Sequence, residues 1–235
     1  GAKWVKVPLD SSMRTDLAAL SRAITPATRA VYICHPNNPT GTTLPPEAVR
    51  DACLEMSKRT LVVVDEAYAD YLPPAQRADL ASLVRTGENV CLLRTFSKIH
   101  ALAGMRVGYA MGRKELLAKM RRSEWGTQMT NQAGLVGAFT SLDDTANILE
   151  NRRRNVAVMA STQSMLTGLG FSPIPSVANH IWFALRRPAG KFREDLANAG
   201  YAVVASSEKD GEWCRLTLGT PEQMTGFEKA LRALV

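Results

Sequence analysis

The sequence predicts an α/β protein with a mostly parallel sheet, followed by a smaller region in which helices and strands are mixed. Short apolar runs alternate with amphipathic stretches along the chain, which is typical of strands joined by helices. Several apolar runs end directly at polar segments, as strands do when they lead into ligand-binding loops. The 235 residues are 46% hydrophobic and 22% charged, an ordinary composition with ample material for a core.

Local patterns assign the elements of the first part. Leu17, Leu20 and Ile24 recur at helical spacing, which predicts a helix over residues 15–24. Proline at 45 or 46 suits the first turn of a helix that continues to about residue 58. We expect strands at 4–8, 30–34, 61–64, 90–93 and 106–111, and further helices at 115–122 and 131–141.

The rest of the sequence indicates one long helix and then a small mixed region. Residues 145–166 show the pattern of a single helix that is rich in arginine in its first turns. After Gly168 we expect strands at 180–185, 203–205 and 214–218, and helices at 192–199 and 221–234.

Three of the expected strands end beside reactive or polar side chains, namely Asn38, Asp65 and Lys98. Because ligands bind beyond the carboxyl ends of the strands in open parallel sheets, we expect these residues to serve one site. Together with Tyr68 and Arg106 they provide an amide, a carboxylate, an amine, a phenol and a guanidinium. Pyridoxal phosphate is a cofactor that uses all five groups.

Four blocks carry a resemblance to a known family: HPNNPTGT at 35–42, VDEAY at 64–68, TFSKIHALAGMRVGY at 95–109 and CRLTLGT at 214–220. In this order they resemble the class I/II aminotransferases of fold type I, and histidinol-phosphate aminotransferase in particular. The resemblance implies part of the large pyridoxal-phosphate-binding domain at 1–144, an interdomain helix at 145–167 and a small α+β C-terminal domain at 168–235. It also implies that the family's N-terminal part lies outside this sequence.

The resemblance assigns the central chemistry to Lys98 and Asp65. Lys98 would form a Schiff base with pyridoxal 5′-phosphate and then transfer protons, although a lone lysine is more often a surface residue. An ordinary lysine, with a pKa of about 10.4, is a weak nucleophile, and burial near cationic groups lowers that pKa. Asp65 would pair with the pyridine nitrogen so that the ring can accept electrons. A helix cap at the strand end is the competing interpretation of Asp65.

The remaining cofactor contacts follow from the same resemblance. Tyr68 and Asn38 would hydrogen-bond the phenolic oxygen, although the residues around Asn38 are also typical of a simple turn. Arg106 would bind the cofactor phosphate through its planar fork, with Thr95 and Ser97 adding hydroxyl donors. Alternatively, Arg106 opens a strand and only caps an edge of the sheet.

Substrate contacts are expected from the C-terminal region. Arg215 stands inside an apolar strand and would bind the substrate α-carboxylate; since buried arginine is rare unless paired, an internal acidic partner is the alternative. Asn179 is a second substrate-binding candidate. Two histidines depart from the family pattern: His35 stands where a small polar residue is commoner, and His100 replaces part of a more usual aromatic-glycine step. We favour a packing role for His100 over contact with the phosphate.

These assignments predict pyridoxal-phosphate-dependent transamination between an amino acid or amino-alcohol phosphate and a 2-oxo acid, in two half-reactions. One alternative is decarboxylation of an amino-acid phosphate with the same cofactor, because fold does not decide reaction type. Another is a non-catalytic module, because the family's first part is lacking. Since fold type I sites usually lie between subunits, we expect a homodimer.

Composition narrows the choice of partners. A net charge of +7 could indicate nucleic acid, but the arginine cluster at 152–154 has no interleaved aromatic residues. We therefore expect a solvated helix face and anionic small-molecule ligands, with no nucleic-acid, membrane or metal partner. The four cysteines form no C-x-x-C pair, which favours reduced thiols and a cytoplasmic protein. An export signal in a preceding segment is the alternative.

Overall fold

The computed structural model describes residues 1–122, 130–208 and 210–234, and the chain divides into two compact units. The first unit comprises Gly1–Asn37 and Thr43–Leu149, and the second comprises Asn38–Thr42 and Glu150–Val235. The chain therefore enters the second unit twice, once for a five-residue segment and once for its C-terminal part.

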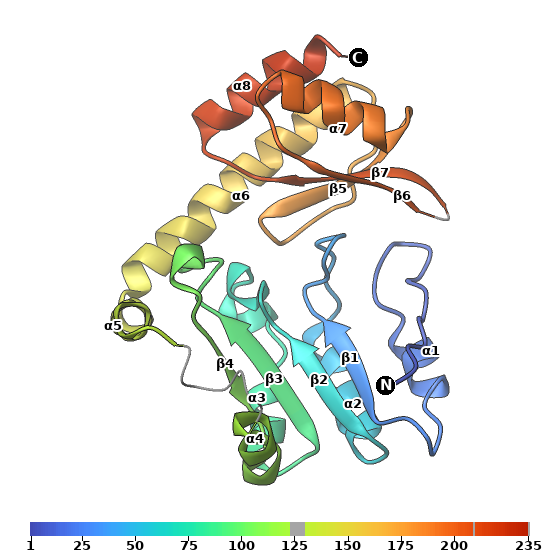
Figure 1. Ribbon diagram of the computed structural model, residues 1–235, viewed down its shortest axis with the longest axis vertical. Helices are drawn as coiled ribbons and strands as arrows, with labels where there is room; N and C mark the ends of the chain where they lie inside the picture. The colour runs from blue at the N-terminus through green and yellow to red at the C-terminus, as the bar shows by residue number, and fades with distance from the viewer. Residues whose placement is uncertain (123–129, 209, 235) are drawn as a thin grey trace. The chain divides into compact units, whose positions relative to one another are not determined.

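The first unit is built on a four-stranded sheet with the order β1-β2-β3-β4 (Figure 1). Its strands are β1 (Ala30–Cys34), β2 (Leu61–Asp65), β3 (Val90–Thr95) and β4 (Gly108–Met111). The strands β1, β2 and β3 run parallel, and β4 pairs antiparallel with β3. The predicted α/β class with a mostly parallel sheet is confirmed.

Helices connect these strands and bury one side of them. The helices are α1 (Leu17–Arg22), α2 (Pro46–Ser57), α3 (Leu80–Arg85), α4 (Lys114–Arg121) and α5 (Gln132–Asp143), with 3-10 turns η1 (Ala69–Tyr71), η2 (Pro74–Gln76) and η3 (Ala103–Met105). Val49 and Met56 of α2 are fully buried in one core cluster with Val62 and Val64 of β2. The short α3 was not predicted; Asp79 caps it by accepting from the backbone N–H of Ser82 at 3.1 Å.

Two expectations for the first unit are wrong. Residues 4–8, all within the described ranges, form no strand: the side chains of Trp4 and Val5 are 82% and 69% exposed, and the segment has no neighbour in the sheet. An apolar run becomes a strand only when another strand accepts its hydrogen bonds. The second error concerns Arg106, which does not open a strand. It follows η3 in a left-handed conformation, and β4 begins two residues later.

The second unit contains an antiparallel sheet with the order β5-β7-β6 and three helices (Figure 1). Its elements are α6 (Thr145–Gly168), β5 (His180–Leu185), α7 (Ala189–Asn198), β6 (Val204–Glu208), β7 (Gly211–Thr217) and α8 (Pro221–Arg232). Phe183, Phe192 and Leu231 are fully buried in its core. Thr220 and Gln223 form a capping box that starts α8. The predicted long helix exists, and it begins in the first unit and continues into the second.

Candidate active site

The carboxyl end of β2 holds the Asp65 side chain in a fixed direction. Asp65 is the last residue of β2, between Cys34 of β1 and Leu93 of β3. Its Oδ1 accepts from the backbone N–H of Ala67 at 3.0 Å, and its Oδ2 accepts from the Tyr32 hydroxyl at 2.6 Å. Because both carboxylate oxygens are held, the side chain is oriented before any ligand arrives.

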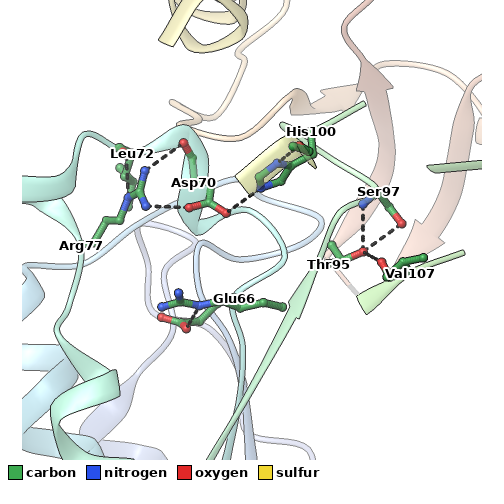
Figure 2. A network of polar contacts seen from close by, with 10 residues as sticks. Glu66, Asp70, Leu72, Arg77, Thr95, Ser97, His100 and Val107 are labelled. Atoms are coloured by element: carbon green, nitrogen blue, oxygen red, sulfur yellow. Dashed lines mark hydrogen bonds and ion pairs between the residues drawn. The ribbon is translucent and has the colours of Figure 1, made fainter. Parts of the chain in front are cut away.

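The loop after β3 brings Lys98 next to Tyr68. Thr95 ends β3, and its Oγ1 accepts from the backbone N–H of Ser97 at 3.0 Å and lies 2.9 Å from Ser97 Oγ (Figure 2). Beyond this turn, Lys98 Nζ lies 5.3 Å from the centroid of the Tyr68 ring. An ammonium group at this distance from an aromatic face is attracted to it. The Asp65 carboxylate at the end of β2, the buried phenol just after it and the Lys98 amine after β3 therefore belong to the ends of two neighbouring strands.

Arg106 directly precedes the residue at which the chain before β4 bonds to the chain after β3. The backbone N–H of Phe96 donates to the Val107 carbonyl at 3.1 Å, next to the last strand pair. Arg106 has a φ of 53°, which is uncommon outside glycine and recurs at functional sites. Its exposed guanidinium donates from Nη1 to the Ala103 carbonyl at 2.7 Å, which leaves further N–H groups for an anion.

A polar network ties the segment after Lys98 to two other elements (Figure 2). His100 Nδ1 lies 2.5 Å from Ser141 Oγ of α5, and His100 Nε2 lies 3.9 Å from Asp70 Oδ2 in η1. Asp70 also accepts from Arg77 Nη1 at 2.6 Å. The His100 ring is buried and packs on Phe96 with centroids 4.9 Å apart. These contacts agree with the packing role expected for His100.

Glu66 and Arg94 form an ion pair, with a buried carboxylate and a partly exposed guanidinium, that the sequence did not predict. Arg94 Nε donates to Glu66 Oε2 at 2.8 Å, and the Glu66 side chain is 6% exposed. Burial raises the pKa of Glu66, and the Arg94 guanidinium opposes that rise. Each residue stands next to a predicted site residue, Asp65 or Thr95, and points to the other face of its strand. Removing Arg94 would leave the buried Glu66 charge without its partner, so the carboxylate is stable at this position only together with the arginine.

The Asn38 segment belongs to the second unit, and Gly41 explains its shape. The backbone N–H of Val177 donates to the Gly41 carbonyl at 2.9 Å. Gly41 has a φ of +71°, and a Cβ there would lie 1.9 Å from Ser176 Oγ. Only glycine therefore fits this turn. The peptide bond between Asn38 and Pro39 is cis.

Arg215 lies at the centre of the second sheet. Its neighbours across the strands are Trp182 of β5 and Val204 of β6, and its Nη1 donates to Thr217 Oγ1 at 3.1 Å. Asn179 precedes β5, and its carbonyl accepts from the backbone N–H of Leu218 just beyond β7. The Asn179 Oδ1 atom is buried and has no hydrogen-bond partner among the described residues. A buried polar atom in this position suits a bound ligand or water.

His35 fixes the start of the segment that carries Asn38. The His35 ring is buried, and its Nε2 accepts from the backbone N–H of Leu44 at 3.1 Å and lies 3.1 Å from Thr43 Oγ1. Because Nε2 accepts, the neutral ring carries its proton on Nδ1. Burial lowers the pKa of His35 to about 4.

We predict that His35 makes folding stability depend on acid. The unfolded chain binds a proton on this residue below its ordinary pKa of 6.5, whereas the folded chain binds it only near pH 4. Stability therefore falls as the pH drops from 6.5 toward 4, by roughly 2 kcal/mol between pH 7 and pH 5. The measurement is the free energy of unfolding by denaturant across this range. In the His35→Asn variant this slope of stability against pH should be lost, whatever the absolute stability of the variant; an unchanged slope would contradict the assignment.

The nine predicted site residues thus fall into two groups. Six of them lie in the first unit, at or just beyond the carboxyl ends of β2 and β3 or just before β4, which pairs with the end of β3: Asp65, Tyr68, Thr95, Ser97, Lys98 and Arg106. The second unit carries Asn38, Asn179 and Arg215. Tyr32 was missed, because its contact with Asp65 depends on strand register, which no local pattern reveals.

The described residues show no metal-binding cluster, no disulfide and no helix that could span a membrane. Within the described ranges, no group of three or more histidine, cysteine or acidic residues could hold a metal ion. The four cysteines are free thiols in the structure. No helix among the described residues is both long and apolar enough to cross a membrane.

Comparison with known proteins gives one consistent family. The sequence matches the family model for aminotransferase class I and II over residues 1–231. It is 35% identical over 238 residues to histidinol-phosphate aminotransferase of Moorella thermoacetica, covering 100% of this chain and 61% of the relative. It is 34% identical over 232 residues to aromatic amino acid aminotransferase of Mycobacterium bovis, covering 99% of this chain and 64% of the relative.

A solved structure agrees with this match. Histidinol-phosphate aminotransferase from Sinorhizobium meliloti, in complex with pyridoxal-5′-phosphate, superposes with a TM-score of 0.83 at 23% identity. The superposition covers 98% of this chain and 65% of that one. The fold type is therefore shared, and the chain spans less than two thirds of the length of these relatives.

Proposed function

Because this chain belongs to the class I and II aminotransferases, a family whose cofactor is pyridoxal 5′-phosphate, we propose that the protein catalyses transamination. Its substrates would be an amino acid or amino-alcohol phosphate and a 2-oxo acid. The observation that carries the proposal is the position of Lys98 Nζ, 5.3 Å from the Tyr68 ring centroid, on the loop that follows the strand next to Asp65. In this proposal the first unit is part of the cofactor-binding domain.

The chemistry of the first unit fits this cofactor. An ionised carboxylate offers about four lone-pair sites, and Asp65 uses two of them for Ala67 and Tyr32, so sites remain for a ring N–H. When bound, the cofactor supplies an electron sink for the substrate carbon. The Lys98 amine would bind the cofactor covalently and move the substrate proton, and Tyr68 and Asn38 would donate to its phenolic oxygen.

Anions in the site would be divided between two arginines. Arg106, with Thr95 and Ser97, would hold the cofactor phosphate, and its exposed guanidinium, which keeps N–H groups beyond the one used for Ala103, supports this role. Arg215 would hold the substrate α-carboxylate. The buried Asn179 Oδ1, which lacks a hydrogen-bond partner among the described residues, supports a ligand near the start of β5.

The proposal is tested on the intact protein with added pyridoxal phosphate. We expect an absorbance band that shifts on binding and a protein–cofactor link that borohydride makes permanent. Amino donors and 2-oxo acids should then react with ping-pong kinetics. Release of carbon dioxide without a 2-oxo acid product would favour decarboxylation instead. Failure to bind the cofactor would favour a non-catalytic module. We also propose a homodimer, and a fully active monomer in ultracentrifugation would contradict it.

We predict that the two arginines can be separated by conservative substitution. Arg215→Lys keeps the charge but loses the planar two-point fork, so KM for both the amino donor and the 2-oxo acid should rise roughly ten- to a hundredfold. Cofactor retention should not change. Arg106→Lys should do the reverse and weaken cofactor retention first. The measurements are both KM values and the fraction of bound cofactor after dialysis; loss of cofactor from Arg215→Lys at steady KM would show that the roles are exchanged.

A further inference from the structure

Tyr32, on the strand β1 that pairs with β2, makes a hydrogen bond to the Asp65 carboxylate. Tyr32 lies on β1, and its strand partner on β2 is Val63; Cys34, two residues later, is the partner of Asp65. Because side chains two residues apart point to the same face of a sheet, Tyr32 and Asp65 share a face. The long tyrosine side chain reaches diagonally along the strand, and its hydroxyl donates to Asp65 Oδ2 at 2.6 Å.

The Tyr32 contact and a backbone contact together hold both oxygens of the Asp65 carboxylate. The backbone N–H of Ala67 holds Oδ1, and this bond resembles an ordinary turn contact between residues two apart. The bond to Tyr32 joins residues 33 positions apart, so it comes from the sheet and not from the local turn. Burial and the neighbouring Asp65 raise the pKa of Tyr32, so the hydroxyl keeps its proton and remains a donor.

Packing does not explain why this residue is a tyrosine. The Tyr32 side chain is 49% exposed, whereas its neighbours Val31 and Ile33, on the opposite face of β1, are buried in the core. Phenylalanine or valine would occupy the same position in the strand without difficulty. The hydroxyl is the part of the side chain that makes a defined contact.

We infer that Tyr32 is a positioning residue for the cofactor: its hydroxyl fixes the Asp65 carboxylate in the orientation that receives the ring nitrogen of pyridoxal phosphate. The inference rests on the proposed function and adds a residue outside the motif blocks to it. Tyr32 acts through Asp65 and need not touch the cofactor.

The test is the dissociation constant of pyridoxal phosphate for the intact protein and its variants, measured by equilibrium dialysis. Tyr32→Phe should bind the cofactor about tenfold more weakly, because the Asp65 carboxylate is then no longer held in the orientation that receives the ring nitrogen, a loss of the order of one hydrogen bond to a charged group. Asp65→Ala should also bind it more weakly. The double variant should match Asp65→Ala within about twofold, since a residue that acts through Asp65 has nothing left to position. Tyr201→Phe, which removes a phenol hydroxyl in the second unit, serves as the control.

The outcomes distinguish a role through Asp65 from an independent effect of Tyr32 on cofactor binding or on folding. If Tyr32→Phe binds the cofactor as well as wild type, or if the two losses multiply in the double variant, Tyr32 does not act through Asp65. Thermal unfolding of each variant shows whether a loss of binding follows from a loss of folding. If the wild-type protein itself fails to bind pyridoxal phosphate, the proposed function is overturned, and the role of Tyr32 is overturned with it.

Discussion

Replacing Lys98 by alanine should abolish transamination and the borohydride-reducible link to the cofactor, while the fold survives. Lys98 stands on a loop whose local turn is made by Thr95 and Ser97, so the backbone does not depend on the amine. Its Nζ contacts the Tyr68 ring face, an interaction worth about 0.5–1 kcal/mol at an exposed site, and little stability should be lost. No other predicted site residue has an amine that could replace it. Turnover, borohydride trapping and thermal unfolding are the measurements.

Lys58→Ala is a suitable control for the Lys98 variant. Lys58 follows α2, is exposed and pairs with Glu55, so its loss should change neither turnover nor trapping. Near-normal turnover in Lys98→Ala would remove this residue from the proposed mechanism. Loss of turnover with intact borohydride trapping would show that another amine holds the cofactor.

Replacing Asp65 by asparagine should slow turnover by about three powers of ten, which corresponds to about 4 kcal/mol in the activation barrier. Asparagine has nearly the same shape and can still bond to Ala67 and Tyr32, but it has no charge to keep the ring nitrogen protonated. Some cofactor should therefore remain bound while removal of the substrate proton becomes slow. The measurement is single-turnover reaction with an amino donor at known cofactor occupancy.

Asp79→Asn separates this role from that of a cap. Asp79 also accepts from a backbone N–H, at the start of α3, and asparagine is an equally good cap. The Asp79 variant should keep normal turnover. If Asp65→Asn likewise keeps full occupancy and normal rates, then Asp65 only shapes the turn after β2.

Where local pattern and tertiary pairing agreed, the sequence was sufficient to predict the element. The strand at 30–34 was predicted with its observed bounds, because its apolar residues are bounded by polar residues and by the proline-rich turn. The segment at 4–8 has a similar pattern but no partner strand, and it did not form one. The short α3 was overlooked because six residues carry too little periodicity to stand out.

In the candidate site too, some residues could be predicted from local sequence patterns, and others depend on contacts between distant parts of the chain. Lys98, Asp65 and Tyr68 could be proposed because each lies in a compact motif that follows an apolar run. The left-handed backbone of Arg106 could not be predicted, since its sequence has no glycine or asparagine at that position. Tyr32 and the Glu66–Arg94 pair depend on which strands are neighbours and in what register. Such contacts join residues far apart in sequence, and one sequence alone does not reveal them.

The five residues Asn38–Thr42 have a consequence for anyone who wishes to exchange or express the parts of this protein separately. They lie early in the sequence, yet they belong to the C-terminal unit through Gly41, which bonds to Val177 and fits against Ser176. A gene cut between codons 149 and 150 would therefore not separate the two units cleanly. It would leave residues 38–42 of the second unit on the N-terminal fragment. A chimaera made by swapping the C-terminal part would need a matching turn at 38–42, so these distant stretches should be inherited together.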